Sequence, residues 1–328
     1  MDMYNQSPIY PIKDRTGNGN HLYVMRDDLL PFGLGGNKVR IAEQFLQDME
    51  KKGCDTMIAY GNVRSNLCRV IANACYGKKI PCYIICSTQK DESADIETSN
   101  SRIMKLLNAK MVYCKNNQVA DTVEAVMNQI REDGHKPYYI YGNKLGTGNE
   151  GVAAGAYVKA YRQIKEFEKE ASIRFDYIFH ASGTGATQAG LTCGHILEGD
   201  QTQIVGILIS SREYERAVSV IKNGMSSYLE SIGEVWHSEY DQEIILAGEY
   251  TKGGYGAYDD EILQCIKEEF QEDSLPLDPV YTGKAFLGMQ KYVMEQKIRD
   301  KNILFLHTGG TPLFYDSLNE GVILKNEV

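Results

Sequence analysis

The sequence predicts an α/β fold built from open, twisted, mainly parallel sheets flanked by helices, and three observations carry that prediction. Short apolar runs of four to seven residues recur along the 328-residue chain. The runs are apolar throughout rather than alternating, which is typical of strands covered on both faces. Longer amphipathic stretches separate them, and strand–helix alternation at this spacing favours parallel sheets.

Each element follows from its local pattern. The runs rich in Ile, Val and Tyr are predicted as strands, at 56–60, 81–86, 111–114, 137–141, 177–181, 204–210, 243–247 and 303–307. Helices are predicted over 39–53, 65–79, 121–134 and 150–170. In the first helix, Ile41, Phe45, Leu46 and Met49 share one face, and Gly53 ends the helix.

No repeat or linker marks a domain boundary. Residues 51–160 hold four strand–helix pairs and are predicted to form a small α/β domain. Residues 1–50 and 161–328 would then form the larger domain. Ligands of such folds bind beyond the carboxyl ends of the strands, often where two domains meet.

Composition narrows the classes of partner. The chain is 43% hydrophobic and 24% charged, with a net charge of −9, so nucleic acid and anionic membranes are not expected as partners. No secretory signal pattern and no apolar run of about 18 residues is visible. Eight scattered cysteines without a CxxC pair disfavour zinc and redox motifs. We therefore expect a cytoplasmic protein with reduced thiols and no metal.

Residues 177–199 read as a buried strand, a Gly/Ser/Thr loop and a helix. In that arrangement, loop amides and the positive end of the helix point at one place, which suits a phosphate. No Gly-Lys-Ser/Thr follows, and Gln188 stands where a dinucleotide motif has its third glycine. The pattern predicts a site for a single phosphate, and the alternative is a tight capped turn.

The stretch "GLGGNKVR" places Lys38 after three glycines and an asparagine. A lysine is a nucleophile only when it is neutral, and a crowded or desolvated site favours that state. Glycines before it leave room for a planar ring. Together with the phosphate site, this suggests pyridoxal phosphate, with its aldehyde held by Lys38 as a Schiff base. The alternative is a solvated surface lysine.

Five stretches taken together resemble a known family. They are "RDDLLPFGLGGNKVR" (26–40), "YGNVRSNLCR" (60–69), "SGTGATQAGL" (182–191), "DPVYTGKAFLGM" (278–289) and "LHTGGTPLF" (306–314). In order and content they are similar to the D-cysteine desulfhydrase and 1-aminocyclopropane-1-carboxylate deaminase family. These are pyridoxal-phosphate enzymes of the tryptophan-synthase-β fold type (fold type II). The resemblance implies a cofactor between two domains, a small amino-acid substrate and a homodimer.

The resemblance also implies roles for individual residues. Lys38 would bind the cofactor covalently and Asn66 would hydrogen-bond its phenolic oxygen, while Ser65 would lie near the substrate carboxylate. Two tyrosines, Tyr255 and Tyr281, match the active-site pair, although in a chain with 22 tyrosines each could be a packing residue. The phosphate would be bound by Thr184, Gly185, Ala186 and Thr187.

Two positions separate the branches of the family. Deaminases carry a glutamate directly after the tyrosine of "DPVY" and a leucine before the last Gly-Gly pair. This chain has Thr282 and Thr308 there, which match the desulfhydrase branch, and either threonine could face the pyridine nitrogen. A neutral hydroxyl leaves a weaker electron sink than a carboxylate would. Expelling a thiolate should demand less of the ring than opening a cyclopropane.

The implied activity is therefore β-elimination, with D-cysteine giving pyruvate, hydrogen sulfide and ammonia. Three alternatives stay open: deamination of 1-aminocyclopropane-1-carboxylate, elimination from another β-substituted amino acid, and a non-catalytic sensor that binds pyridoxal phosphate. The chain departs from the family at Arg64 and Leu67, where the motif usually has polar, uncharged residues. Arg64 could bind an extra carboxylate of the substrate or point to solvent, and Leu67 could make that wall more apolar.

Overall fold

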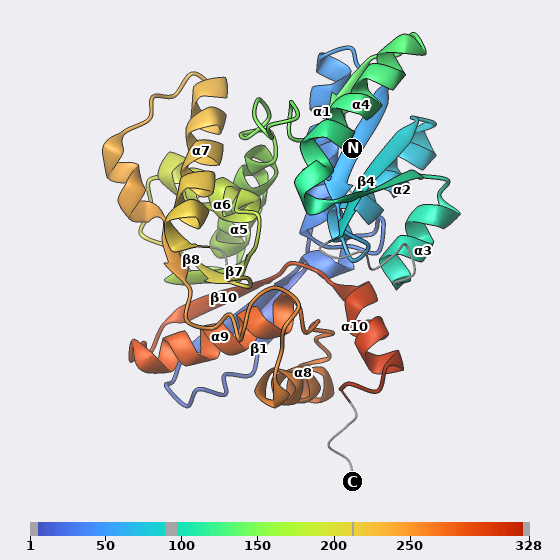
Figure 1. The fold of residues 1–328 in the computed structure, drawn as a ribbon. Coiled ribbons are helices and arrows are strands. Elements are labelled where there is room, and N and C mark those ends of the chain that lie inside the picture. The colour runs from blue at the N-terminus through green and yellow to red at the C-terminus, as the bar shows by residue number, and fades with distance from the viewer. Residues whose placement is uncertain (1–5, 89–96, 212, 324–328) are drawn as a thin grey trace.

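The computed structural model describes residues 6–88, 97–211 and 213–323, and its strands form two sheets (Figure 1). The larger sheet has the order β1-β2-β10-β7-β8-β9, and the smaller has the order β5-β4-β3-β6. All neighbouring strands are parallel except the β1–β2 pair. The prediction of two mainly parallel sheets is confirmed. The strands of the larger sheet are β1 (Ile9–Ile12), β2 (His21–Arg26), β7 (Tyr177–Ser182), β8 (Gln203–Leu208), β9 (Ile245–Ala247) and β10 (Asn302–His307). Those of the smaller are β3 (Thr56–Gly61), β4 (Cys82–Thr88), β5 (Lys110–Lys115) and β6 (Pro137–Tyr139).

Each of the eight predicted runs overlaps a strand, but β1 and β2 were not predicted. β1 is a short edge strand that contains Pro11, which opposes Tyr23 in the antiparallel pair. An edge strand tolerates proline because one side of it needs no ladder hydrogen bonds. The continuous apolar runs match strands buried on both faces: in β10, residues Ile303–Leu306 are at most 2% exposed.

Helices cover both faces of the larger sheet (Figure 1). On one face lie α5 (Ala154–Ala171), α6 (Ala186–Glu198) and α7 (Tyr214–Ser231), and on the other α8 (Asp260–Asp273) and α9 (Thr282–Glu295). The smaller sheet is flanked by α2 (Asn66–Lys78), α3 (Ser99–Leu106) and α4 (Val119–Glu132). Two helices lie between the sheets: α1 (Asn37–Lys51) packs on α2 and α5, and α10 (Thr311–Asn319) packs on α3. Short 3-10 helices are η2 (Asp27–Leu29), η3 (Asn116–Gln118) and η4 (Ser238–Glu243). Within the described ranges, no helix is long and apolar enough to cross a membrane.

The strands of the smaller sheet all fall within residues 51–160, and those of the larger sheet fall outside that range. The helix α5 begins at Ala154, inside that range, yet it packs along α6 of the larger sheet. Two glycines of α6 explain the close approach. A side chain at Gly190 would lie 2.3 Å from the carbonyl oxygen of Ala154, and one at Gly194 would lie 2.5 Å from Cβ of Tyr161.

Candidate active site

A cavity of 990 Å³ lies between the two sheets. It is lined by the segments that follow β3 in the smaller sheet and β7, β8 and β10 in the larger one, so the carboxyl ends of strands from both sheets converge on it. The lining brings together nine of the eleven residues that the sequence singled out: Lys38, Ser65, Asn66, Thr184, Gly185, Thr187, Tyr255, Tyr281 and Thr308. Of the other two, Ala186 packs its side chain into the core and Thr282 is fully buried outside the lining. Arg64 and Leu67 also line the cavity.

Lys38 is the second residue of α1, and its side chain is half-buried. Lys38 lines the cavity on one side, and protein atoms surround it on the others. Burial lowers the pKa of its amine to about 8, and no neighbouring carboxylate opposes that shift. A pKa near 8 leaves roughly a tenth of the amine neutral at pH 7, against about one part in three thousand for an ordinary lysine. The site therefore prepares Lys38 as a nucleophile or base.

The loop before Lys38 touches the loop after β10 through two glycines. Gly36 (φ +97°) and Gly309 (φ +105°) lie so close that a Cβ on Gly309 would be 2.6 Å from Cα of Gly36. A Cβ on Gly36 would be 3.0 Å from the carbonyl oxygen of Thr308. The amide of Asn37 donates to that same oxygen at 2.9 Å. The contact fixes Lys38 beside Thr308 and leaves a wall without side chains.

A buried polar network holds the start of α1. The carboxylate of Asp27 accepts hydrogen bonds from Arg40 at 3.1 Å, from Ser7 at 2.5 Å and from Tyr157. Its backbone oxygen accepts from the amide of Gly36 at 2.7 Å. Arg40 and Asp27 are both almost fully buried, and the pair is hydrogen-bonded on several sides, as a buried ion pair requires.

The start of α6 is an open anion site. Its N-cap is Gly185 (φ +88°), and no side chain caps the amides of the first turn. Unsatisfied amides and the positive end of a helix favour a phosphate. Thr184 and Thr187 line the same end of the cavity, and Asn37 Nδ2 donates to Thr187 Oγ1 at 3.0 Å. Ala186 can contribute only its backbone amide, because its side chain faces the core.

Ser65 and Asn66 form the N-terminus of α2. Ser65 is the N-cap, and its Oγ accepts from the amide of Cys68 at 3.2 Å, so its proton stays available to a ligand. Asn66 Oδ1 accepts from Asn100 Nδ2 at 2.9 Å. That bond turns the NH₂ group of Asn66 away from Asn100 and makes it available as a donor. Asn100 was not predicted from the sequence, because it lies 34 residues away on α3.

The two predicted tyrosines meet at their hydroxyls. Tyr255 and Tyr281 are 2.6 Å apart, oxygen to oxygen. Burial and the Tyr255 hydroxyl hold the pKa of Tyr281 well above its usual range. Tyr281 therefore stays protonated at neutral pH and has a proton to donate.

Asp278 stabilises the turn that contains Tyr281. Its carboxylate accepts from the amides of Val280, Tyr281 and Thr282, and from the Thr282 hydroxyl at 2.9 Å. Burial nonetheless raises the pKa of Asp278 to about 6. A side chain at Gly310 would lie 2.1 Å from this carboxylate. Thr282 thus acts within this turn, whereas Thr308 reaches the cavity. An aspartate two to four residues before free amides is a turn signal that sequence reasoning could have used.

A second buried lysine braces the Tyr255 loop. Lys284 is 1% exposed, and its amine donates to the carbonyl oxygens of Gly254 at 2.7 Å and Ile209 at 3.2 Å. Burial lowers its pKa to about 8. It lies in the "DPVYTGKAF" stretch, but no local pattern distinguishes it from a surface lysine.

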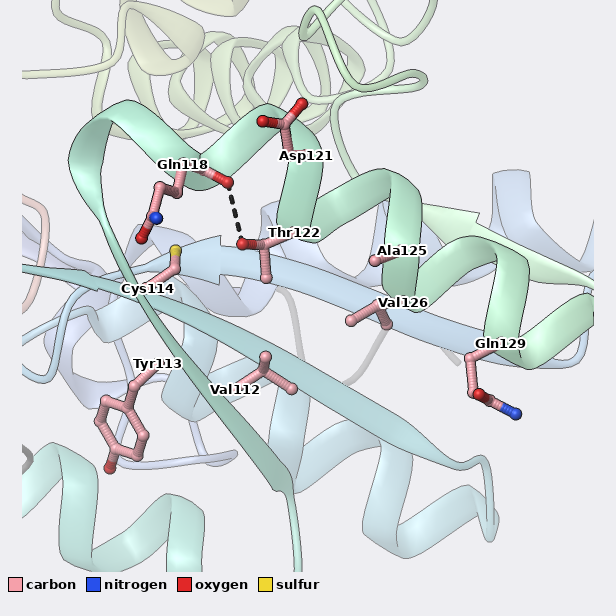
Figure 2. A pocket seen from close by; sticks show the side chains of 9 residues that line it. All are labelled: Val112, Tyr113, Cys114, Gln118, Asp121, Thr122, Ala125, Val126 and Gln129. Atoms are coloured by element: carbon pink, nitrogen blue, oxygen red, sulfur yellow. Dashed lines mark hydrogen bonds between the residues drawn. The ribbon is translucent and has the colours of Figure 1, made fainter.

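Another hollow of about 490 Å³ lies between β5 and α4, open to solvent (Figure 2). Val112, Ala125 and Val126 give it an apolar floor, and Thr122 Oγ1 donates to the carbonyl oxygen of Gln118 at 2.8 Å. Its lining contains none of the predicted site residues and no acid–base pair of side chains. The larger cavity is the candidate active site.

The donor set of that cavity fits pyridoxal phosphate. A lysine prepared to be neutral suits an aldehyde, and the open start of α6 suits one phosphate. The glycine contact beside Lys38 leaves space that a Cβ would fill. Asn66 and Thr308 add a donor and a hydroxyl for the ring substituents.

Comparisons with known proteins agree with this fit. The family model described as pyridoxal-phosphate dependent enzyme matches residues 2–309. The chain is 29% identical over 307 residues to the D-cysteine desulfhydrase of Serratia proteamaculans (strain 568), covering 90% of this chain and 88% of that protein. It is 32% identical over 297 residues to a Pyrococcus abyssi (strain GE5 / Orsay) protein provisionally named 1-aminocyclopropane-1-carboxylate deaminase, covering 90% and 86%. A crystal structure titled as an ACC deaminase homologue superposes with a TM-score of 0.83 at 28% identity, covering 98% of this chain and 93% of that one.

Proposed function

This chain belongs to the pyridoxal-phosphate-dependent enzymes, and from that premise we propose that it catalyses β-elimination from a small β-substituted amino acid. D-cysteine is the substrate of this class that the sequence motifs favour, with pyruvate, hydrogen sulfide and ammonia as products. The observation that carries the proposal is that one cavity is lined both by Lys38, whose pKa is lowered, and by Thr308. Among the described residues that line the cavity, none is a carboxylate.

Several residues would hold the cofactor. Lys38 would bind its aldehyde carbon, Asn66 its phenolic oxygen and Thr308 its ring nitrogen. Thr282 would act on the ring only indirectly, because its hydroxyl is bonded to Asp278. The phosphate would lie at the start of α6, bound by Thr184, Gly185, Ala186 and Thr187.

When bound, pyridoxal phosphate supplies an electron-poor ring that accepts the negative charge left when a proton leaves the α-carbon of an amino acid. Lys38 Nζ takes that proton as a general base, which its lowered pKa permits at neutral pH. Ser65 Oγ and the amides at the start of α2 bind the substrate carboxylate. The small polar loop thereby fixes the α-carbon within reach of Lys38.

Tyr281 acts at the leaving group. The bond between Cβ and sulfur breaks, the electron pair leaves with sulfur, and the tyrosine pair supplies the proton that converts thiolate into hydrogen sulfide. The hydroxyl contact of 2.6 Å lets Tyr255 replace the proton that Tyr281 gives up. The remaining 2-aminoacrylate takes up water and yields pyruvate and ammonia.

Elimination is favoured over opening of a cyclopropane by the groups near the ring. A hydroxyl at position 308 leaves the ring nitrogen less strongly protonated than a glutamate would. Expulsion of a good leaving group tolerates this weaker electron sink, whereas carbon–carbon bond cleavage without a leaving group does not. The relatives do not decide the question, since one is named a desulfhydrase and the other a deaminase at similar identity.

The test is a product assay on the purified, cofactor-loaded protein. D-cysteine, L-cysteine and 1-aminocyclopropane-1-carboxylate are each incubated with the enzyme, and pyruvate, sulfide and 2-oxobutyrate are measured. Pyruvate and sulfide in equal amounts are expected from a cysteine, with Tyr281→Phe slowing kcat about 100-fold or more. Formation of 2-oxobutyrate instead would establish the deaminase. Absence of any product alongside a spectral response to amino acids would indicate a sensor.

Two further properties belong to the same proposal. We propose a homodimer, which sedimentation analysis of the purified protein tests directly. All eight cysteines are unpaired thiols, which suits a reducing compartment such as the cytoplasm. Thiol titration after denaturation without reductant should therefore find every cysteine reactive.

A further inference from the structure

The cavity is positively charged although the protein is acidic. Its described lining contains two charged side chains, Lys38 and Arg64, and both are cations. The whole chain has a net charge of −9. A cleft with one sign of charge concentrates ligands of the opposite sign. The cavity therefore attracts anionic ligands, which the rest of this acidic protein does not.

The expected negative groups of a loaded site leave Arg64 without a partner. The cofactor phosphate has the open start of α6, and the α-carboxylate has Ser65 with the start of α2. Lys38 would be occupied by the aldehyde carbon of the cofactor. The guanidinium of Arg64 is exposed at the cavity wall and directly precedes Ser65. A planar guanidinium binds carboxylate, sulfonate and phosphate groups through two parallel hydrogen bonds.

The backbone around Arg64 is held firmly while its side chain is not. Its amide donates to Asn62 Oδ1 at 2.9 Å, and its carbonyl oxygen accepts from Asn100 Nδ2 at 2.9 Å. The neighbouring carbonyl of Val63 accepts from Thr98 Oγ1 at 2.6 Å. The first turn of α3 therefore positions the loop, and the guanidinium remains available to a ligand.

Resting on the β-elimination proposed above, we infer that Arg64 selects amino acids whose β-substituent carries a second negative group. Carboxylate, sulfonate, thiosulfate and phosphate groups share this chemistry. A sulfonate, thiosulfate or phosphate group would leave with the electron pair of the broken bond to Cβ, and Arg64 would stabilise the departing anion. A carboxylate would be bound but not expelled. No additional reactant is needed, because the α-proton goes to Lys38 and the products are the free anion and 2-aminoacrylate.

The decisive experiment compares aspartate with asparagine, which match in shape and differ in charge. Each enantiomer is titrated into the loaded enzyme, and its dissociation constant is read from the absorbance of the bound cofactor. The wild type should bind aspartate roughly 10- to 100-fold more tightly than asparagine. Arg64→Gln should bring this ratio close to one, and Arg64→Lys should restore part of it. Arg131→Gln, which removes an exposed arginine bonded to Asn128 on α4, should leave it unchanged.

Turnover separates this inference from the proposed reaction. S-sulfocysteine carries an anionic leaving group and β-chloroalanine a neutral amino-acid side chain, and both should release pyruvate. In Arg64→Gln the ratio of their kcat/KM values should fall about 10-fold or more. Turnover of β-chloroalanine with no preference for anions in either assay would overturn the role of Arg64 and leave the elimination standing. An Arg64-dependent preference for aspartate with no pyruvate from any compound would leave charge selection standing and overturn the elimination.

Discussion

Raising the pH from 7 to 10 is expected to accelerate the covalent capture of pyridoxal phosphate by the cofactor-free protein and then to reach a plateau. Only the neutral amine attacks an aldehyde. Burial lowers the pKa of Lys38 from 10.5 to about 8. The neutral fraction is then roughly 10% at pH 7, 50% at pH 8 and 90% at pH 9.

The rate should therefore rise about tenfold, with nearly all of the rise below pH 9. A solvated lysine with the ordinary pKa of 10.5 would behave differently, because its neutral fraction would increase several hundredfold over the same interval without levelling off. The shape of the profile, rather than the absolute rate, distinguishes the two cases.

The assay mixes cofactor-free protein with pyridoxal phosphate in a stopped-flow instrument and follows the change in absorbance. Borohydride reduction and peptide mapping then locate the modified residue. Lys284 provides an internal comparison, since burial lowers its pKa to about 8 as well. Its amine is bonded to two carbonyls and does not line the cavity, so it should carry no label. A rate that still climbs above pH 9.5, or a label on Lys284, would refute the account of Lys38.

Three substitutions test how the site is held. Lys38→Met should raise the free energy of unfolding of the cofactor-free protein by about 1–3 kcal/mol at pH 7, measured with urea. The gain should shrink between pH 8 and 10.5, because in that window the folded protein has already released the proton of Lys38 while the unfolded chain still binds it, and the difference disappears only above the unfolded-state pKa of 10.5. An equal gain at pH 10.5 would contradict this. Asn100→Ala should weaken cofactor binding about 5- to 20-fold in a spectral titration, because it frees the amide that it orients. Asn128→Ala on the exposed face of α4 is the matched control. Asp316→Asn should cost about 0.5–1.5 kcal/mol of stability, because the carboxylate accepts from Ser99 at 2.5 Å at the start of α3; unchanged stability would remove that contact from the account.

Local patterns predicted much of the fold for a physical reason. A strand covered on both faces needs apolar side chains at every position, so its signal is continuous and short, as in β7 and β10. The strand β1 lacks that signal because none of its four residues is fully buried. The sequence of α5 also gave no indication that this helix packs with the larger sheet. That packing depends on Gly190 and Gly194 of another helix, whose missing side chains admit α5.

The residues of the candidate site also divide into those with a local sequence signal and those without one. Several groups that line the cavity lie in glycine-rich loops at strand ends, and the composition of these loops pointed to Lys38 and the start of α6. Groups that act through another residue have no such signature. Asn100 and Lys284 are bonded to segments that reach them only in three dimensions, whereas Asp278 holds its own turn and could have been found from its local pattern. Sequence reasoning therefore finds the residues that line the cavity more readily than the distant residues that hold them in place.

The contact between Gly36 and Gly309 limits how this protein can change. A methyl group at either position would meet backbone atoms rather than a side chain that could rotate away. Replacing one glycine cannot be offset by shrinking the other, since neither has anything left to remove. The distance between the reactive amine and the opposite loop is thus protected from gradual mutation. Variation in this enzyme must enter elsewhere, through residues whose side chains, unlike these two positions, have room to be exchanged.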